Sequence, residues 1–162
     1  MKINYLLVFA VCILLVGVSN LEAEEFNPNL AFIGRYDSDD HAANAVAISG
    51  DYAYIAYGNA GLVIVNIEDS TNPTAVASIF TSDAYNVAIS GNYAYVADYY
   101  NGLVIVNIEN PTNPTWVGTY DTGNAYDVAI SGNYTYVADS YGLVVVNTED
   151  PTNPTFVESY EM

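Results

Sequence analysis

The chain has 162 residues, 52% of them hydrophobic, and it carries 19 acidic residues against two basic ones. The formal net charge of -17 repels polyanions, so we expect neither nucleic acid nor anionic lipid to be a partner. With one Cys and one His in the whole sequence, neither a disulfide nor a His- or Cys-based metal site can be built.

The first residues have the pattern of an export signal. Lys2 is followed by an apolar run from Tyr5 to Val18 and then by small and polar residues up to Ala23. The run is shorter than the about 20 residues that span a bilayer. We therefore predict a signal peptide at residues 1–23 and a secreted or cell-surface protein, with no membrane segment after cleavage. A retained, uncleaved anchor is the alternative.

Residues 24–29 are expected to form a linker, and residues 30–162 a single repeat domain. The segment 31–37 aligns with the fourth strand of the repeat unit described below, so it predicts one N-terminal strand without a blade of its own. A non-repetitive loop at 38–43 holds His41. A lone histidine without a nucleophile motif nearby does not indicate catalysis, and we predict no catalytic residue and no enzyme activity.

Three tandem repeats make up the remainder of the chain, at about 45–81, 86–122 and 127–162. Their phase is fixed by three sets of glycines and prolines that recur at intervals of 41 or 40 residues: Gly50, Gly91 and Gly132; Gly61, Gly102 and Gly142; Pro73, Pro114 and Pro154. A shared phase at three separate markers indicates a repeat architecture.

Each repeat predicts four short strands, which in the second repeat are 86–90, 93–98, 103–107 and 115–120. A Gly-Asn or Gly-Asp pair between the first two is typical of a two-residue hairpin turn. The third strand is apolar at consecutive positions, so both of its faces are expected to be covered. Four strands in about 41 residues predict an all-β, β-propeller-like fold, with a parallel β-helix as the alternative.

The repeat unit also resembles a known family. The sequence Gly102-Leu103-Val104-Ile105-Val106-Asn107, followed by Asn-Pro-Thr and by Val-Ala-Ile-Ser-Gly-Asn-Tyr, is similar to the LVIVD repeat. The resemblance covers roughly residues 27–162 and implies an exported or surface protein with propeller blades. One departure is consistent: the family's closing Asp is Asn here, which keeps a hydrogen-bonding side chain without the charge, at Asn66, Asn107 and Asn147.

Three blades and one N-terminal strand are too few for an ordinary closed ring, because propellers have four to eight blades. The sequence leaves three alternatives: the chain pairs with a second copy, it completes another repeat protein, or it is a fragment of a longer reading frame. We favour self-association that completes a propeller ring.

Two sets of polar residues recur at strand ends. Asp98 and Asp139 end the second strands, where Tyr57 stands in the first repeat, and we predict Asx turns there rather than calcium ligands. Asn86 and Asp127 begin the first strands, where a propeller has its channel mouth, and Ala45 takes this place in the first repeat.

Tyrosine pairs recur on the second strands, and we expect them to pack between blades rather than to form a surface for glycans or protein partners: Tyr52 and Tyr54, Tyr93 and Tyr95, Tyr134 and Tyr136. The glycosylation sequon that begins at Asn133 coincides with a hairpin turn.

We predict an exported or cell-surface repeat protein that acts as a non-enzymatic scaffold for protein or glycan contacts, with no cofactor and no metal. A calcium-stabilised structural module is one alternative. A hydrolase or lyase that uses an acid site around Asp127 and Asn86 is the other.

Overall fold

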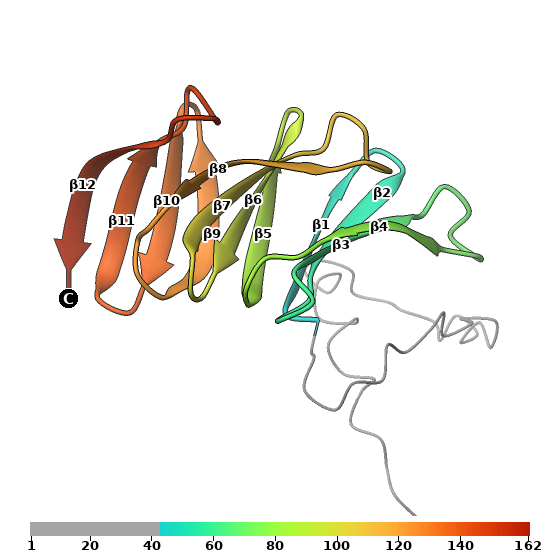
Figure 1. Cartoon of the computed structure of the whole chain (residues 1–162), viewed down its shortest axis with the longest axis horizontal. Helices are drawn as coiled ribbons and strands as arrows, with labels where there is room; N and C mark the ends of the chain where they lie inside the picture. Colours follow the sequence, from blue (N-terminus) through green and yellow to red (C-terminus); the bar gives the residue numbers. More distant parts are fainter. Residues whose placement is uncertain (1–42) are drawn as a thin grey trace, which may run out of the picture. The chain divides into compact units, whose positions relative to one another are not determined.

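The computed structural model describes residues 43–162, which form three four-stranded antiparallel sheets and no helix (Figure 1). The first sheet contains β1 (Ala45–Ser49), β2 (Tyr52–Ala56), β3 (Leu62–Asn66) and β4 (Thr74–Ile79). The second contains β5 (Ala84–Ser90), β6 (Tyr93–Asp98), β7 (Gly102–Asn107) and β8 (Thr115–Tyr120). The third contains β9 (Ala125–Ser131), β10 (Tyr134–Asp139), β11 (Gly142–Asn147) and β12 (Thr155–Glu161).

These sheets confirm the predicted all-β fold of tandem propeller-like blades. Each sheet is a meander in which neighbouring strands follow one another in the sequence. The predicted signal peptide at 1–23, the linker at 24–29, the additional strand at 31–37 and His41 lie outside the described residues.

Glycine sets the tight turn between the first two strands of each sheet. Gly50, Gly91 and Gly132 have φ angles of 55°, 54° and 58°, in the left-handed region that glycine enters without steric cost. Ser90 pairs with Tyr93 across the second of these turns, so only two residues connect the strands. The predicted two-residue hairpins are therefore confirmed.

The third strand of each sheet ends in an asparagine that shapes the following turn. The side-chain Oδ1 of Asn66 accepts a hydrogen bond from the backbone N–H of Glu68 at 2.9 Å. The backbone N–H groups of Glu109 and Glu149 donate in the same way, also at 2.9 Å, to the Oδ1 atoms of Asn107 and Asn147. This role requires an acceptor but no charge, which explains why Asn can replace the Asp of the LVIVD motif.

Each sheet has two faces, which we name by repeated residues. The leucine face carries Leu62, Leu103 and Leu143 in the three sheets, and the valine face carries Val46, Val87 and Val128. One hydrophobic core joins the leucine face of the first sheet to the valine face of the second. A second core joins the leucine face of the second sheet to the valine face of the third.

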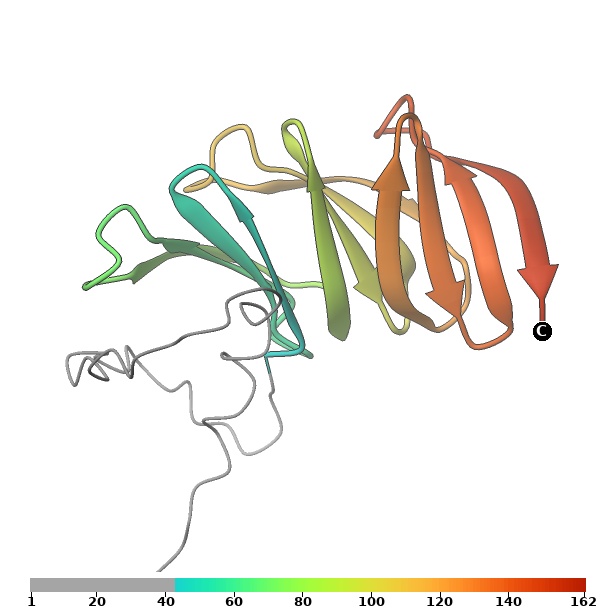
Figure 2. The same cartoon turned by 180° about the vertical axis from the view of Figure 1, so that it is seen from behind.

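The second sheet is therefore covered on both faces, between the other two sheets (Figures 1 and 2). Its third strand shows this directly, because the four consecutive residues 103–106 are all fully buried. The prediction that the third strand is covered on both sides is confirmed for β7 but is wrong for β3 and β11, where half-buried residues alternate with buried ones because only one face of each sheet has a neighbour within residues 43–162. The first strands β1, β5 and β9 contact one another in order, as the inner strands of propeller blades do.

The glycine at the start of the third strand lies very close to the backbone of the segment beside it. Gly102 has φ +72°, and a Cβ there would lie 2.5 Å from the backbone N of Thr122 and 2.6 Å from the carbonyl O of Tyr120. We expect Gly102→Ala to lower the free energy of unfolding by more than the about 1–2 kcal/mol that a left-handed residue costs.

Gly91→Ala is the matched control, because its φ is +54° but a Cβ would meet nothing within 4 Å. Urea unfolding of both variants measures the difference. Equal losses would contradict a role for the close approach at Gly102.

Candidate functional site

The turn after β6 is organised by a carboxylate that is fully buried, that of Asp98. Its Oδ1 accepts hydrogen bonds from the backbone N–H groups of Tyr100 (3.3 Å) and Asn101 (3.0 Å) and from the side-chain amide of Asn101 (2.9 Å). Its Oδ2 accepts from the backbone N–H groups of Ser82 (2.6 Å) and Asp83 (2.9 Å). The predicted Asx turn is confirmed, and the same side chain also ties down the segment that enters the second sheet.

Asp139 holds the equivalent position in the third sheet but makes fewer bonds. Its Oδ1 accepts from the backbone N–H groups of Tyr141 (2.7 Å) and Gly142 (2.8 Å), which confirms the local Asx turn. In the segment that enters the third sheet, the N–H of Gly123 donates to Asp121 instead. At the first repeat, the backbone of Tyr57 closes the turn by donating to the carbonyl of Gly61 (2.8 Å).

Four tyrosines gather beside the Asp98 turn and form what we name the tyrosine cluster: Tyr85, Tyr99, Tyr100 and Tyr126. Tyr85 and Tyr99 are stacked with ring centroids 5.5 Å apart. Tyr126 meets both rings edge-on at 5.6 and 5.4 Å, and Tyr100 meets Tyr99 edge-on at 4.8 Å. Tyr100 is 68% exposed and Tyr126 is 41% exposed, so the cluster presents aromatic surface to solvent.

The cluster also changes the acidity of one of its phenols. The Tyr99 side chain is hydrogen-bonded to that of Tyr126, which raises the pKa of Tyr99. The nearby phenol groups of Tyr126, Tyr100 and Tyr85 act in the same direction, because a phenolate at Tyr99 would be repelled by theirs. Tyr99 therefore stays a neutral hydrogen-bonding group throughout the physiological pH range.

Two strands and one turn supply the cluster. Tyr85 lies near the start of β5, Tyr126 lies near the start of β9, and the other two tyrosines follow Asp98 between β6 and β7. The start of β5 is held by Gly58, whose N–H and carbonyl pair with Ala84 at 3.1 and 2.9 Å. The turn that contains Tyr99 and Tyr100 is held separately, by the hydrogen bonds that Asp98 accepts.

Sequence reasoning missed the tyrosine cluster. Tyr85 and Tyr126 stand 41 residues apart, each directly before one of the predicted channel-mouth residues Asn86 and Asp127, and that repetition was the available signal. The first repeat has Asn44 at this position, and its side-chain amide donates to the carbonyl of Ala84 at 2.8 Å.

The predicted channel-mouth residues lie on neighbouring strands but do not begin them. Asn86 is the third residue of β5 and is half-buried, and Asp127 is the third residue of β9 and is exposed. The Oδ1 of Asp127 accepts from the N–H of Val128 at 2.8 Å. Ala45 is half-buried at the start of β1. Within residues 43–162, no three acidic, His or Cys side chains are grouped so as to hold a metal ion.

The predicted packing of the tyrosine pairs is confirmed where a next sheet covers them. Tyr54 and Tyr95 are buried within the two cores, and burial raises the pKa of both phenols. Tyr136, the equivalent residue of the third sheet, is only half-buried, and Tyr134 is exposed. At the sequon, Asn133 is exposed in its turn, whereas Thr135 is buried and hydrogen-bonded to the hydroxyl of Thr148 at 2.9 Å.

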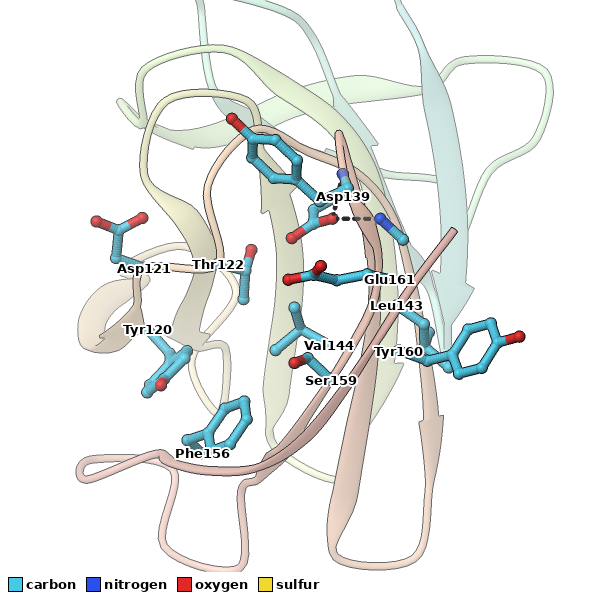
Figure 3. A pocket seen from close by; sticks show the side chains of 12 residues that line it. Tyr120, Asp121, Thr122, Asp139, Leu143, Val144, Phe156, Ser159, Tyr160 and Glu161 are labelled. Atoms are coloured by element: carbon cyan, nitrogen blue, oxygen red, sulfur yellow. Dashed lines mark hydrogen bonds between the residues drawn. The ribbon is translucent and has the colours of Figure 1, made fainter.

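A small cavity of about 200 Å³ opens beside the third sheet (Figure 3). Three carboxylates line it, those of Asp121, Asp139 and Glu161, together with the hydroxyl-bearing Thr122. The volume is below the roughly 300–1,000 Å³ of most small-molecule sites. The four members of the tyrosine cluster do not line this cavity, so the cluster and the cavity are separate features.

The sheets and their repeated turns define a β-propeller-like repeat protein. The LVIVD repeat family matches residues 41–81, 82–122 and 123–162, and the chain belongs to this family. A comparison with curated proteins finds no match. Among the described residues, no helix has the length and apolar character needed to cross a membrane.

The contrast between Asp98 and Asp139 yields a stability prediction. We expect Asp98→Ala to lower the free energy of unfolding by about 3 kcal/mol or more, because five donors lose a buried charged acceptor. Asp139→Ala is the matched control and should cost about 1–2 kcal/mol, because two donors lose a partly exposed acceptor. Thermal unfolding of both variants checks the order, and an equal loss would contradict the linking role of Asp98.

Proposed function

We propose that this chain is an exported or cell-surface repeat protein that acts as a non-enzymatic interaction scaffold. The observation that carries the proposal is the tyrosine cluster, four aromatic rings in contact, of which Tyr100 and Tyr126 are exposed, beside a turn fixed by a buried carboxylate. Tyrosine provides large contact area at low conformational-entropy cost and is enriched among the residues that dominate binding energy.

Export is supported by the order of residues at the N-terminus and by the acidic composition. The basic, apolar and small-residue regions follow one another within residues 1–23. The net charge of -17 also supports export, because a strongly charged surface favours solubility outside the cell.

The partner that fits best is a protein with a basic surface. The chain that carries the cluster is strongly acidic. Because opposite charges attract, a positively charged partner would associate with it faster than a neutral one. Its rings are also held by one another, so little side-chain freedom is lost on binding. A glycan that stacks on the exposed rings is the competing partner and is distinguished by the experiment below.

We expect the exported product of the full reading frame to begin at Glu24, because cleavage follows the small residue Ala23. N-terminal sequencing of the protein recovered outside the cell measures this. Ala23→Phe is the control, since a bulky residue at the cleavage position should leave the signal attached. Recovery of the whole chain in the cytoplasm with Met1 in place would contradict export.

A second experiment tests the cluster itself. The double variant Tyr100→Ala, Tyr126→Ala removes its two most exposed rings, and Tyr141→Ala is the control, because Tyr141 is the repeat equivalent of Tyr100 and is 72% exposed. The probes are a panel of purified basic and acidic cell-surface proteins and a glycan array. We expect at least about 30-fold weaker binding of a basic protein by the double variant, since one hot-spot tyrosine contributes about 2 kcal/mol.

The control should bind that protein as the unaltered chain does. Equal binding by the double variant would exclude the cluster as the contact surface. Loss of signals on the glycan array alone would keep the cluster and replace the protein partner by a glycan.

A further inference from the structure

The two end sheets expose faces that are complementary to each other. Within the chain, the leucine face of one sheet is always covered by the valine face of the next. Two faces have no sheet of this chain's described residues against them: the valine face of the first sheet and the leucine face of the third.

Exposure along the valine face follows this pattern. Val87 and Val128, which pack against a preceding sheet, are 5% and 6% exposed. Val46 is their repeat equivalent in the first sheet and is 53% exposed, and Ile48 beside it is 66% exposed. The valine at this repeat position is therefore a core residue in the second and third sheets and a surface residue in the first.

Exposure along the leucine face follows the same pattern, except that here the exposed residues belong to the third sheet. Leu62 and Leu103 are fully buried, whereas Leu143 of the third sheet is only half-buried. Tyr120 of β8 is half-buried at the edge of the second core, and its equivalent Tyr160 of β12 is 68% exposed. The third sheet thus presents a surface of the kind that binds a valine face twice within the chain.

We infer that a second copy of this chain docks its valine face, on β1–β3, onto the leucine face of β10–β12. The interface continues one that the molecule already uses between its own sheets, so its geometry and residue types are already specified. Such an interface is heterologous, joining two different surfaces, and two copies would close it into a ring of six blades. Six lies within the four to eight blades of closed propellers.

One residue opposes this docking and gives the proposal a sensitive test. Glu158 stands on the leucine face of the third sheet, paired with Val145. The equivalent residue of the second sheet is Gly118, where an added Cβ would collide with the carbonyl of Pro151 in the turn of the next sheet. Glu158 therefore places a charge where the corresponding turn of a second copy has to pack.

The association of the full exported chain is measured by sedimentation equilibrium over a range of salt concentrations. We expect a dimer whose affinity increases with salt, because two acidic copies repel each other and salt screens that repulsion. Glu158→Gly should tighten the dimer by about tenfold or more, because it removes a charge that docking would desolvate.

Substitutions on each face show which surfaces meet. Val46→Asp and Tyr160→Asp introduce charges at exposed positions on the valine and leucine faces, where the fold tolerates them. Each variant alone should associate at least about 30-fold more weakly. A mixture of the two should form a one-to-one dimer through the single interface that carries neither substitution, and it should associate more tightly than either variant does with itself. Phe80→Asp, at a 72% exposed site outside both faces, is the control.

Three results would overturn the proposal. A chain that stays monomeric at high salt would show that the two faces do not bind each other. A Val46→Asp dimer as strong as the original would show that the valine face is not used. Failure of the two variants to recover a dimer when mixed would exclude head-to-tail docking. None of these outcomes bears on the tyrosine cluster, which lies outside the substituted positions.

Discussion

The structure depends on one constraint: the sheets formed by residues 43–162 carry apolar side chains on both faces, and the second sheet buries both of its faces between two neighbours. Residues 103–106 meet it fully, because leucine and isoleucine pack toward the third sheet while the two valines pack toward the first. A sheet with one apolar face would be satisfied by a single partner and would end the stack. The repeat, the order of the sheets and the composition of each strand all follow from this two-sided burial.

The features that recur in every repeat build the three sheets, and the candidate site lies where the repeats differ from one another. The Asx turn after the second strand occurs at both Asp98 and Asp139, but only Asp98 also holds the segment that enters its sheet. The tyrosine cluster occurs beside that turn, where Tyr85 and Tyr126 of successive repeats come within ring contact. The tyrosine cluster occurs at only one of the two contacts between the described sheets, so the fold does not require it. Its residues can therefore serve binding without a loss of the repeated architecture.

Sequence patterns predicted the elements that depend on local chemistry. The hairpin glycines, the doubly buried third strand of the second sheet and the Asx turns follow from φ preferences, apolar runs and short polar side chains. The tyrosine cluster was not predicted, because the contact between Tyr99 and Tyr126 depends on the distance between two sheets. The start of β5 at Ala84 was also missed, since its pairing with Gly58 joins two different repeats.

Unequal coverage of the sheets also has a kinetic consequence. The second sheet is packed on both faces, whereas β12 at the far edge of the third sheet is exposed along its whole length. Local opening starts where few apolar contacts must be broken, so backbone amides of β12 exchange with solvent at a low energetic cost. Amides of β6 and β7 become accessible only when both cores are disrupted. The first and third sheets are therefore expected to open before the second, and a partner that covered the exposed face of either sheet would slow the opening of that sheet.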